Sequence, residues 1–437
     1  MSIENFTFCK KFNFISQFMS GNFHSLKMIE IQNYFEEKKK LHEHILTYIE
    51  DCEFNKKDFE DLINYIQSQD IFNNREEFEH FLRLILNICN NHHRYPGFFD
   101  KIKQIFFKYK KEIKQTFSNH DLFNLFNDNK MILLFLLNND FIDADEQMIE
   151  ALLNKCELNG IKYCHFFFPE IKKVISDDRI QEIENELLEI DPKIFDNYES
   201  KRQKGENDSY ICTLIQNDSV EEFIQYTTQA CYSFKNEIKP SIFETNEFLN
   251  NNTPKLIEYA AFFGSIQIFN YLRMNKVELT PSLWIYAIHS DNAELIHLLE
   301  EFNCKKSQSY ASFSCEELLC ESIKCHHNDI INYFIMIDNE VCPDYNYSSY
   351  SYEIEEEEEE GETIQDCNLA KNIINTCFCY SNYSYLPNDF NQNFVFFNLA
   401  KFKYSKMVEI YMKAKEEFIE SLILTKKIFF SFNLILI

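Results

Sequence analysis

The chain has 437 residues and carries 43 Lys and Arg against 70 Asp and Glu, a formal net charge of −27 at pH 7. This acid excess argues against a nucleic-acid-binding protein, because phosphates are bound by clustered Lys and Arg. The six glycines lie too far apart for a Gly-rich phosphate loop or a nucleophile elbow, and with only eight prolines the chain lacks the turn residues of an all-β fold. The composition therefore predicts an all-α protein.

The cysteines and the apolar segments indicate in which cellular compartment the protein is expected. The 15 cysteines are odd in number and form no C-x-x-C pair, which is typical of a reduced intracellular protein rather than of a disulfide framework. The N-terminal region lacks the pattern of a signal peptide, and the apolar stretch Met131–Leu137 is too short to cross a bilayer. We therefore expect an intracellular, cytoplasmic protein, with the nucleus as an open alternative.

The first part of the chain divides into an extension and a helical domain. Residues 1–27 are expected to be a disordered extension, and residues 28–198 to form a helical domain in which apolar residues recur at helical spacing. One such series is Phe59, Leu62, Ile63 and Ile66. Pro96 and Pro169 are expected to break the helices, and the polar stretch Glu199–Asp208 to separate this domain from the next.

Two groups of side chains in this domain are candidate binding sites. His92, His93 and Arg94 lie together, but adjacent histidines on a helix point about 100° apart and do not chelate one ion, so we expect a structural role at a helix end. A basic run interleaved with aromatic residues suits an acidic partner, although a solvated helix face is the simpler interpretation. Its members are Lys101, Lys103, Lys108, Lys110, Lys111 and Lys114.

An internal repeat is the most informative feature of the second half of the chain. The segment from Thr253-Pro254 to Ala260 recurs 27 residues later, from Thr280-Pro281 to Ala287, and a third copy is centred on Ser322. At offsets of 4, 8, 9 and 12 from that small residue, each copy has a turn-type residue and three apolar residues. These are Gly264, Ile268, Phe269 and Leu272; Asp291, Leu295, Ile296 and Leu299; and His326, Ile330, Ile331 and Phe334.

Each offset predicts a feature of two antiparallel helices. Thr-Pro is expected to cap and open the first helix, and the small residue lets two helices approach closely. Gly, Asp and His tolerate the positive φ of a sharp turn, and the apolar residues share one face of the second helix. A weaker copy starts at Leu214 with Asp218 at its turn. A fifth is suggested at Ala400, where Tyr404 departs from the turn pattern.

These copies resemble the ankyrin repeat, and the chain as a whole resembles the large ankyrin family of trichomonad protists that has a helical N-terminal domain of unknown function. The segments that carry the resemblance are Asn87–Phe106, Ile257–Leu272, Glu278–His289 and Glu321–Tyr333. The small residues of the copies are 27 and 35 residues apart rather than the ankyrin period of about 33, so the repeats are expected to be degenerate. The resemblance implies a helical stack that binds protein, without an activity or a cofactor.

The remaining boundaries follow from the repeat and from composition. Residues 209–344 and 363–418 are expected to hold ankyrin-like repeats, with the Glu-rich residues 345–362 as an acidic disordered loop and residues 419–437 as an apolar tail. The expected fold is thus an all-α helical N-terminal domain followed by a degenerate ankyrin-like repeat stack, an α-solenoid interrupted by that loop.

The C-terminal half offers weak candidates for chemistry. Cys315, Cys320 and Cys325 are joined by His326 and His327, but these spacings lack the paired short gaps of zinc sites, and no metal, cofactor or catalytic residue is expected. Trp284, the only tryptophan, is expected to pack in the core rather than to form a binding hot spot.

We therefore expect a non-catalytic protein–protein interaction module, a scaffold or adaptor that binds an unidentified protein. In repeat stacks the first helices and the loops form an extended concave face. This predicts binding residues in the loops Asn275–Leu279 and Phe302–Tyr310 and on the exposed side of Pro254–Phe263 and Pro281–Ser290. Nucleic acid, a small-molecule cofactor and a membrane are not expected as partners. Two alternatives stay open: a degenerate family copy without a dedicated partner, and a membrane-associated adaptor that uses the C-terminal tail.

Overall fold

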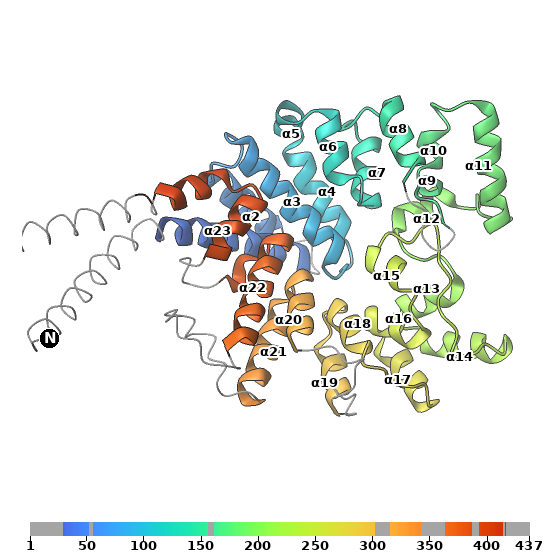
Figure 1. Cartoon of the computed structure of the whole chain (residues 1–437). Coiled ribbons are helices and arrows are strands. Elements are labelled where there is room, and N and C mark those ends of the chain that lie inside the picture. The colour runs from blue at the N-terminus through green and yellow to red at the C-terminus, as the bar shows by residue number, and fades with distance from the viewer. Residues whose placement is uncertain are drawn as a thin grey trace, which may run out of the picture. The chain divides into compact units, whose positions relative to one another are not determined.

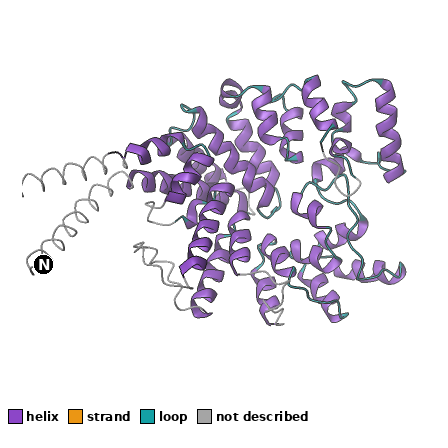
Figure 2. Cartoon of the chain, viewed as in Figure 1, coloured by secondary structure: helices purple, strands orange, loops and turns teal. Residues whose placement is uncertain are grey.

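The computed structural model describes residues 29–51, 56–155, 161–301, 315–341, 363–386, 393–413 and 416. Over these residues the chain is helical and contains no β-strand, only an isolated bridge between Glu237 and Lys255 (Figure 2). The all-α prediction is confirmed for this part of the chain. The predicted extension 1–27, acidic loop 345–362 and apolar tail 419–437 lie outside the described residues.

The chain forms two compact units, and the first unit takes residues from both ends of the chain. Unit 1 comprises Met1–Tyr48, Asn55–Gln69 and Asn339–Ile437; unit 2 comprises Ile49–Phe54 and Asp70–Asp338. The predicted boundary Glu199–Asp208 therefore lies inside unit 2, where most of it belongs to helix α12 (Tyr198–Lys204). The buried Arg202 of that helix makes a two-pronged ion pair with Glu170, at 2.6 and 2.9 Å.

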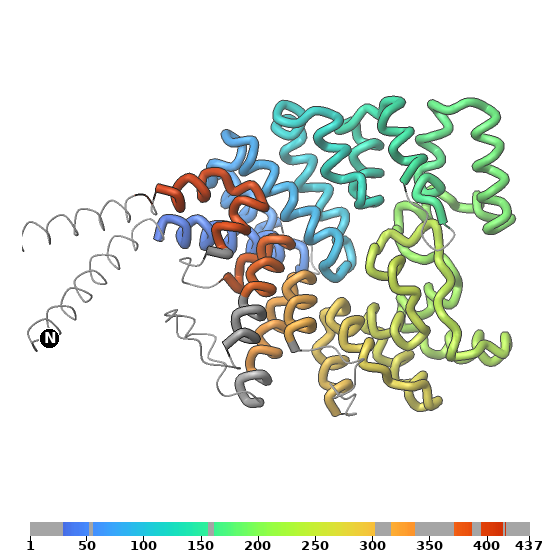
Figure 3. The backbone as a smooth tube through the Cα atoms, viewed as in Figure 1, coloured from blue at the N-terminus to red at the C-terminus, as the bar shows by residue number. Residues whose placement is uncertain are grey.

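Unit 2 begins with a series of short helices that follow one another along its upper edge in Figures 1 and 3. They are α3 (Arg75–Asn91), α4 (Phe98–Lys108), α5 (Lys110–Thr116), α6 (Asn119–Phe126), α7 (Lys130–Asn138), α8 (Glu146–Leu153), α9 (Tyr163–Phe166), α10 (Phe168–Ile171) and α11 (Asp177–Ile190). Side chains that accept backbone N–H groups fix several starts, as Asn74 does for α3 and Asn129 for α7. The apolar stretch Met131–Leu137 lies within α7, almost wholly buried.

The chain then turns and returns along the lower edge of unit 2 as four helix pairs (Figures 1 and 3). The pairs are α13 (Tyr210–Gln216) with α14 (Val220–Gln229), α16 (Leu256–Phe262) with α17 (Ile266–Met274), α18 (Leu283–His289) with α19 (Ala293–Glu301), and α20 (Cys315–Lys324) with α21 (Asn328–Val341). Helix α15 (Glu247–Asn252) lies between the first two pairs in sequence. The first helices contact one another in the order α13, α16, α18 and α20.

The four turns between first and second helices have the backbone that the sequence predicts. Asp218, Gly264, Asp291 and His326 all have positive φ, at 48°, 65°, 50° and 61°. In the second pair the Ser265 N–H donates to the Ala260 carbonyl and the Gly264 N–H to the Ala261 carbonyl, at 2.9 and 3.1 Å. These are the two bonds of a Schellman motif, which satisfies the last carbonyls of a helix and needs a left-handed residue.

The repeat positions are buried as expected. The small residues Ala260, Ala287 and Ser322 are inaccessible to solvent, and all nine apolar residues at the later offsets are buried. Because the second helix places these residues on one face, that face packs inward. The Thr-Pro prediction is wrong in one respect: the residues preceding the helices are Lys255 and Ser282, so Thr253 and Thr280 do not cap them. Thr253 instead ends α15 with φ 39°.

Unit 1 has its own core. Its helices are residues 29–48 of the first helix, α2 (Lys56–Ser68), α22 (Thr363–Tyr380), the 3₁₀ turn η1 (Tyr383–Tyr385), α23 (Asn393–Lys401) and a helix over residues 405–413. Phe35 lies 5.3 Å from Phe378 and 5.4 Å from Tyr404, ring centre to ring centre. The two ends of the chain therefore share one apolar cluster.

The suggested fifth copy lies in unit 1, one residue earlier than predicted. The positive φ falls on Lys403, at 61°, and the Tyr404 N–H donates to the Leu399 carbonyl at 2.8 Å. Counting from Leu399 places Met407 and Tyr411 at the apolar offsets, and both are buried, whereas Met412 is exposed. Tyr404 thus follows the turn instead of forming it, which explains its poor fit to the pattern.

Candidate functional site: the junction of residues 91–103 with the helix pairs

The first helices of the middle two pairs are buried on all sides. Every residue of α16 and of α18 is buried. A helix at the edge of a stack would leave one face to solvent, so other parts of the chain cover these two helices. The prediction that Pro254–Phe263 and Pro281–Ser290 present an exposed binding face is therefore wrong.

The loop between α3 and α4 provides part of this cover. A ring nitrogen of His92 donates to the Cys325 carbonyl at 3.0 Å, although the two residues are 233 positions apart. The Tyr95 hydroxyl donates to Asp291, a turn residue of the third pair. His92 ends α3, as expected of a structural residue at a helix end. The predicted His92–Arg94 cluster thus joins the upper helices to the helix pairs.

Hydrogen bonds also fix the tautomer of His327 at this junction. Its Nδ1–H donates to the Ile288 carbonyl at 2.7 Å, and its Nε2 accepts the His93 N–H at 3.4 Å. Burial lowers the pKa of His327 well below its usual range, and burial together with His92 lowers that of His93 to about 4. Both rings are therefore neutral near pH 7 and contribute hydrogen bonds rather than charge.

Arg94 holds the same loop to the segments that precede α16. Its Nη1 donates to the Gly205 carbonyl at 3.2 Å and to the Thr245 hydroxyl at 2.9 Å. Gly205 has φ 69°, and an added Cβ would lie 2.5 Å from the Met131 sulfur, so glycine is needed there. Burial lowers the pKa of Arg94, and it raises that of the nearby Glu244.

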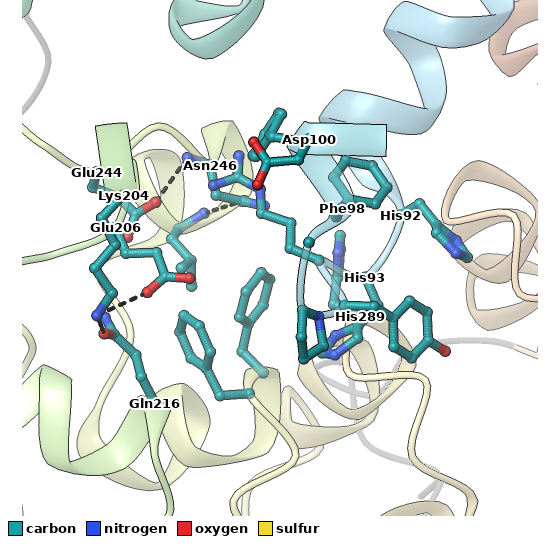
Figure 4. Close-up of a pocket in the computed structure, with 18 of the residues that line it drawn as sticks. His92, His93, Phe98, Asp100, Lys204, Glu206, Gln216, Glu244, Asn246 and His289 are labelled. Atoms are coloured by element: carbon teal, nitrogen blue, oxygen red, sulfur yellow. Dashed lines mark hydrogen bonds and ion pairs between the residues drawn. The ribbon is translucent and has the colours of Figure 1, made fainter. Parts of the chain in front are cut away.

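A cavity of about 470 Å³ opens at this junction. Figure 4 shows His93 and His289 together on one side of it and Lys204, Glu206 and Gln216 on the other. Lys204 bridges the Glu206 carboxylate at 3.1 Å and the Gln216 amide oxygen at 2.6 Å. The lining thus combines imidazole rings with polar groups that already pair with one another.

A second cluster adjoins the cavity through His289. One ring nitrogen of His289, a carboxylate oxygen of Glu321 and the sulfur of Cys325 all lie within 4.8 Å of one another. The His289 Nε2 is 2.8 Å from Glu321, and the Cys325 sulfur is 3.5 Å from Nδ1. Sequence reasoning missed this group, because its members are 32 and 4 residues apart and only the fold brings His289 to the other two.

The other predicted candidates have mainly structural positions. Trp284 is buried, as expected. Within the basic run Lys101 is also buried and donates to the carbonyls of Ile49 and Asp51, and Lys110 and Lys114 bind carbonyls of the turn after α7. Of the predicted Cys and His cluster, Cys325 belongs to the group at His289, and His326 is the turn residue.

Of the two predicted binding loops, Asn275–Leu279 is partly exposed, whereas Phe302–Tyr310 lies outside the described residues.

Among the helices that the structure describes, none combines the length and the apolarity that crossing a bilayer requires. No family model, curated protein or solved structure matches the chain. The ankyrin resemblance therefore rests on the sequence pattern.

Proposed function

We propose that this chain is a non-catalytic protein–protein interaction module, a scaffold or adaptor whose four helix pairs form a degenerate ankyrin-like solenoid. The observation that carries the proposal is the repeated turn. Asp218, Gly264, Asp291 and His326 share a left-handed backbone at one offset, and the first helices contact each other in sequence order. A stack of equivalent pairs presents an extended surface, which is how repeat proteins bind other proteins.

The partner surface in this proposal is an exposed side of the second helices α17 and α21, because the first helices α16 and α18 are buried within the chain. Met274 and Met336 occupy the same position in their pairs, 14 residues after Ala260 and Ser322. Both are strongly exposed, at 74% and 67%. Exposed methionines adapt to varied apolar partners, and the loop Asn275–Leu279 adds polar groups beside Met274.

The experiment is affinity enrichment of cellular proteins with the full chain and with Met274→Glu. A carboxylate at this position should reduce capture of specific partners at least tenfold, because its desolvation opposes binding. Met412→Glu, on an exposed residue of unit 1, is the matched control and should retain them. Equal capture by all three proteins would contradict the proposed surface.

A second candidate function is a family copy without a dedicated partner. The burial of every residue of α16 and α18 favours it, since the surface that the repeat pattern offers to partners is occupied within the chain. The same enrichment experiment distinguishes the two candidate functions. If the chain has no dedicated partner, every protein that the wild type captures should also be captured by Met274→Glu.

A further inference from the structure

We propose that His289, Glu321 and Cys325 bind one zinc ion at the junction of the third and fourth helix pairs. The three side chains come from three places in the fold: the last residue of α18, the body of α20 and the turn that follows α20. Their donor atoms lie within 4.8 Å of one another. The site is separate from the exposed surface at Met274 and does not depend on the proposed function.

The donor set and its spacing suit zinc. Zinc prefers nitrogen, sulfur and carboxylate ligands in tetrahedral geometry, with bonds of about 2.0–2.3 Å, so a sulfur and a nitrogen on one ion lie about 3.6 Å apart. The Cys325 sulfur is 3.7 Å from the Nε2 of His289, the ring nitrogen that faces Glu321. The His289 Nε2 and the Glu321 oxygen, now 2.8 Å apart, need to separate by only about 0.6 Å to reach ligand spacing.

The surrounding structure holds the ligands in place. The His289 ring stacks on Phe248, with ring centres 4.1 Å apart, and faces Phe262 at 5.4 Å. The Cys325 N–H donates to the Glu321 carbonyl at 2.9 Å, so the backbone fixes the last two ligands relative to each other. Such support around the ligands is what keeps a metal site in a productive geometry.

The charges also balance. A thiolate and a carboxylate together neutralise a divalent cation, which favours binding in a buried site. Lys324 is the competing cation, because its ammonium lies 2.8 Å from the Glu321 oxygen. Its side chain is only partly buried, so it can turn to solvent when the ion enters. His289 also lines the 470 Å³ cavity, so the site adjoins that space on one side. A water would be the fourth ligand of the ion.

The test is a Co²⁺ titration of the full chain after treatment with a chelator. Co²⁺ takes the place of zinc and gives a thiolate-to-cobalt charge-transfer band when a cysteine binds it. We expect saturation at one equivalent with this band in the wild-type chain, displacement of cobalt by added Zn²⁺, and loss of the band in Cys325→Ser. Cys320→Ser, which changes a cysteine of α20 outside the cluster, should keep the band.

A second variant distinguishes the loss of a metal ligand from a folding defect. Glu321→Gln keeps the size and a hydrogen-bonding oxygen of the side chain but removes its charge, so it should fold like the wild type and bind Co²⁺ at least tenfold more weakly. Circular dichroism of each variant reports the fold. No band in the wild type, a band unchanged in Cys325→Ser, or undiminished affinity in Glu321→Gln would overturn the proposal and leave the cluster as a hydrogen-bonded core network.

Discussion

At the scale of single residues, the backbone of the repeat turns decides which side chains fit. Gly264 has φ 65°, and an added Cβ would lie 3.2 Å from the amide nitrogen of Asn292. The left-handed region costs a β-branched residue the most, whereas Asn tolerates it. The residue types found at the four turns follow from this single constraint.

Gly264→Val should therefore lower the free energy of unfolding by about 1–2 kcal/mol or more, because it adds a branched side chain at positive φ. Gly264→Asn is the matched control and should cost less, within about 1 kcal/mol. Urea unfolding followed by circular dichroism measures both. An unchanged unfolding midpoint in Gly264→Val would contradict the role of this turn.

A buried lysine gives a prediction about pH. Burial lowers the pKa of Lys130 from 10.5 to about 8, although its ammonium donates to the Glu244 carbonyl at 3.1 Å. The ammonium also lies 5.5 and 5.4 Å from the rings of Tyr163 and Phe166, and the charge of Lys155 lowers its pKa further. Because the folded pKa is depressed, the contribution of Lys130 to stability is complete above about pH 10.5 and is lost as the pH falls to 8.

Lys130→Met should then be more stable than the wild type by about 1–3 kcal/mol at pH 7, since it removes the cost of the buried charge. The Glu244 carbonyl keeps a partner in the Asn250 amide, 3.1 Å away. The difference should shrink between pH 8 and 10.5. Urea unfolding across this range measures it, with Lys276→Met, at an exposed position, as control. A difference that does not vary with pH would refute the assignment.

At the scale of elements, the loop between α3 and α4 acts as a link between two groups of helices. Tyr95 and Asp291 form one of its hydrogen bonds, and burial raises the pKa of Asp291 while this bond lowers it. A buried charged acceptor has already given up its contacts with water. If its donor is then removed, the loss of free energy is larger than the net contribution of the hydrogen bond, because neither water nor the donor compensates the charge.

We predict that Tyr95→Phe lowers the free energy of unfolding by about 1–3 kcal/mol and speeds hydrogen exchange in α18, which the loop covers. Tyr210→Phe, at a tyrosine that is 55% exposed, should change neither quantity. Hydrogen exchange measured by mass spectrometry reports the protection of α18 separately from that of the other helices. Equal protection of α18 in both variants would show that this bond does not hold the loop in place.

The helices themselves were largely accessible to sequence analysis, but their exposure was not. The periodic series Phe59, Leu62, Ile63 and Ile66 falls on α2, and the apolar offsets in the repeats fall on α17, α19 and α21. The error concerned α16 and α18, where an expected exposed face is buried. Their sequences are apolar on nearly every side, so the continuous run from Leu283 to Ile288 is the signal that could have corrected the prediction.

At the scale of the whole molecule, unit 1 depends on both ends of the chain. Phe35 is buried against Phe378 and Tyr404, which lie more than 300 residues further along. Its core is distinct from that of unit 2, so we expect a mutation that destabilises one unit to leave the other folded.

Phe35→Ala should destabilise unit 1 by about 3–5 kcal/mol through lost burial and the cavity left behind. Limited proteolysis should then cleave within α22 and α23 sooner than in the wild type while α16–α19 stay protected. Phe397→Ala is the control, because Phe397 lies in α23 but is 64% exposed. Simultaneous loss of both units would argue that they unfold as one.

The sequence by itself determined the local features of this protein: its helical class, the buried positions of the repeats, and the turns at Asp218, Gly264, Asp291 and His326. These follow from interactions between residues a few positions apart, which spacing and residue type express directly. The tertiary structure alone decided that α16 and α18 are covered, that His92 binds the Cys325 carbonyl, and that His289 meets Glu321 and Cys325. Such contacts depend on the small rotation of each helix pair relative to the next, accumulated over many helices. No short segment of the sequence determines this accumulated rotation.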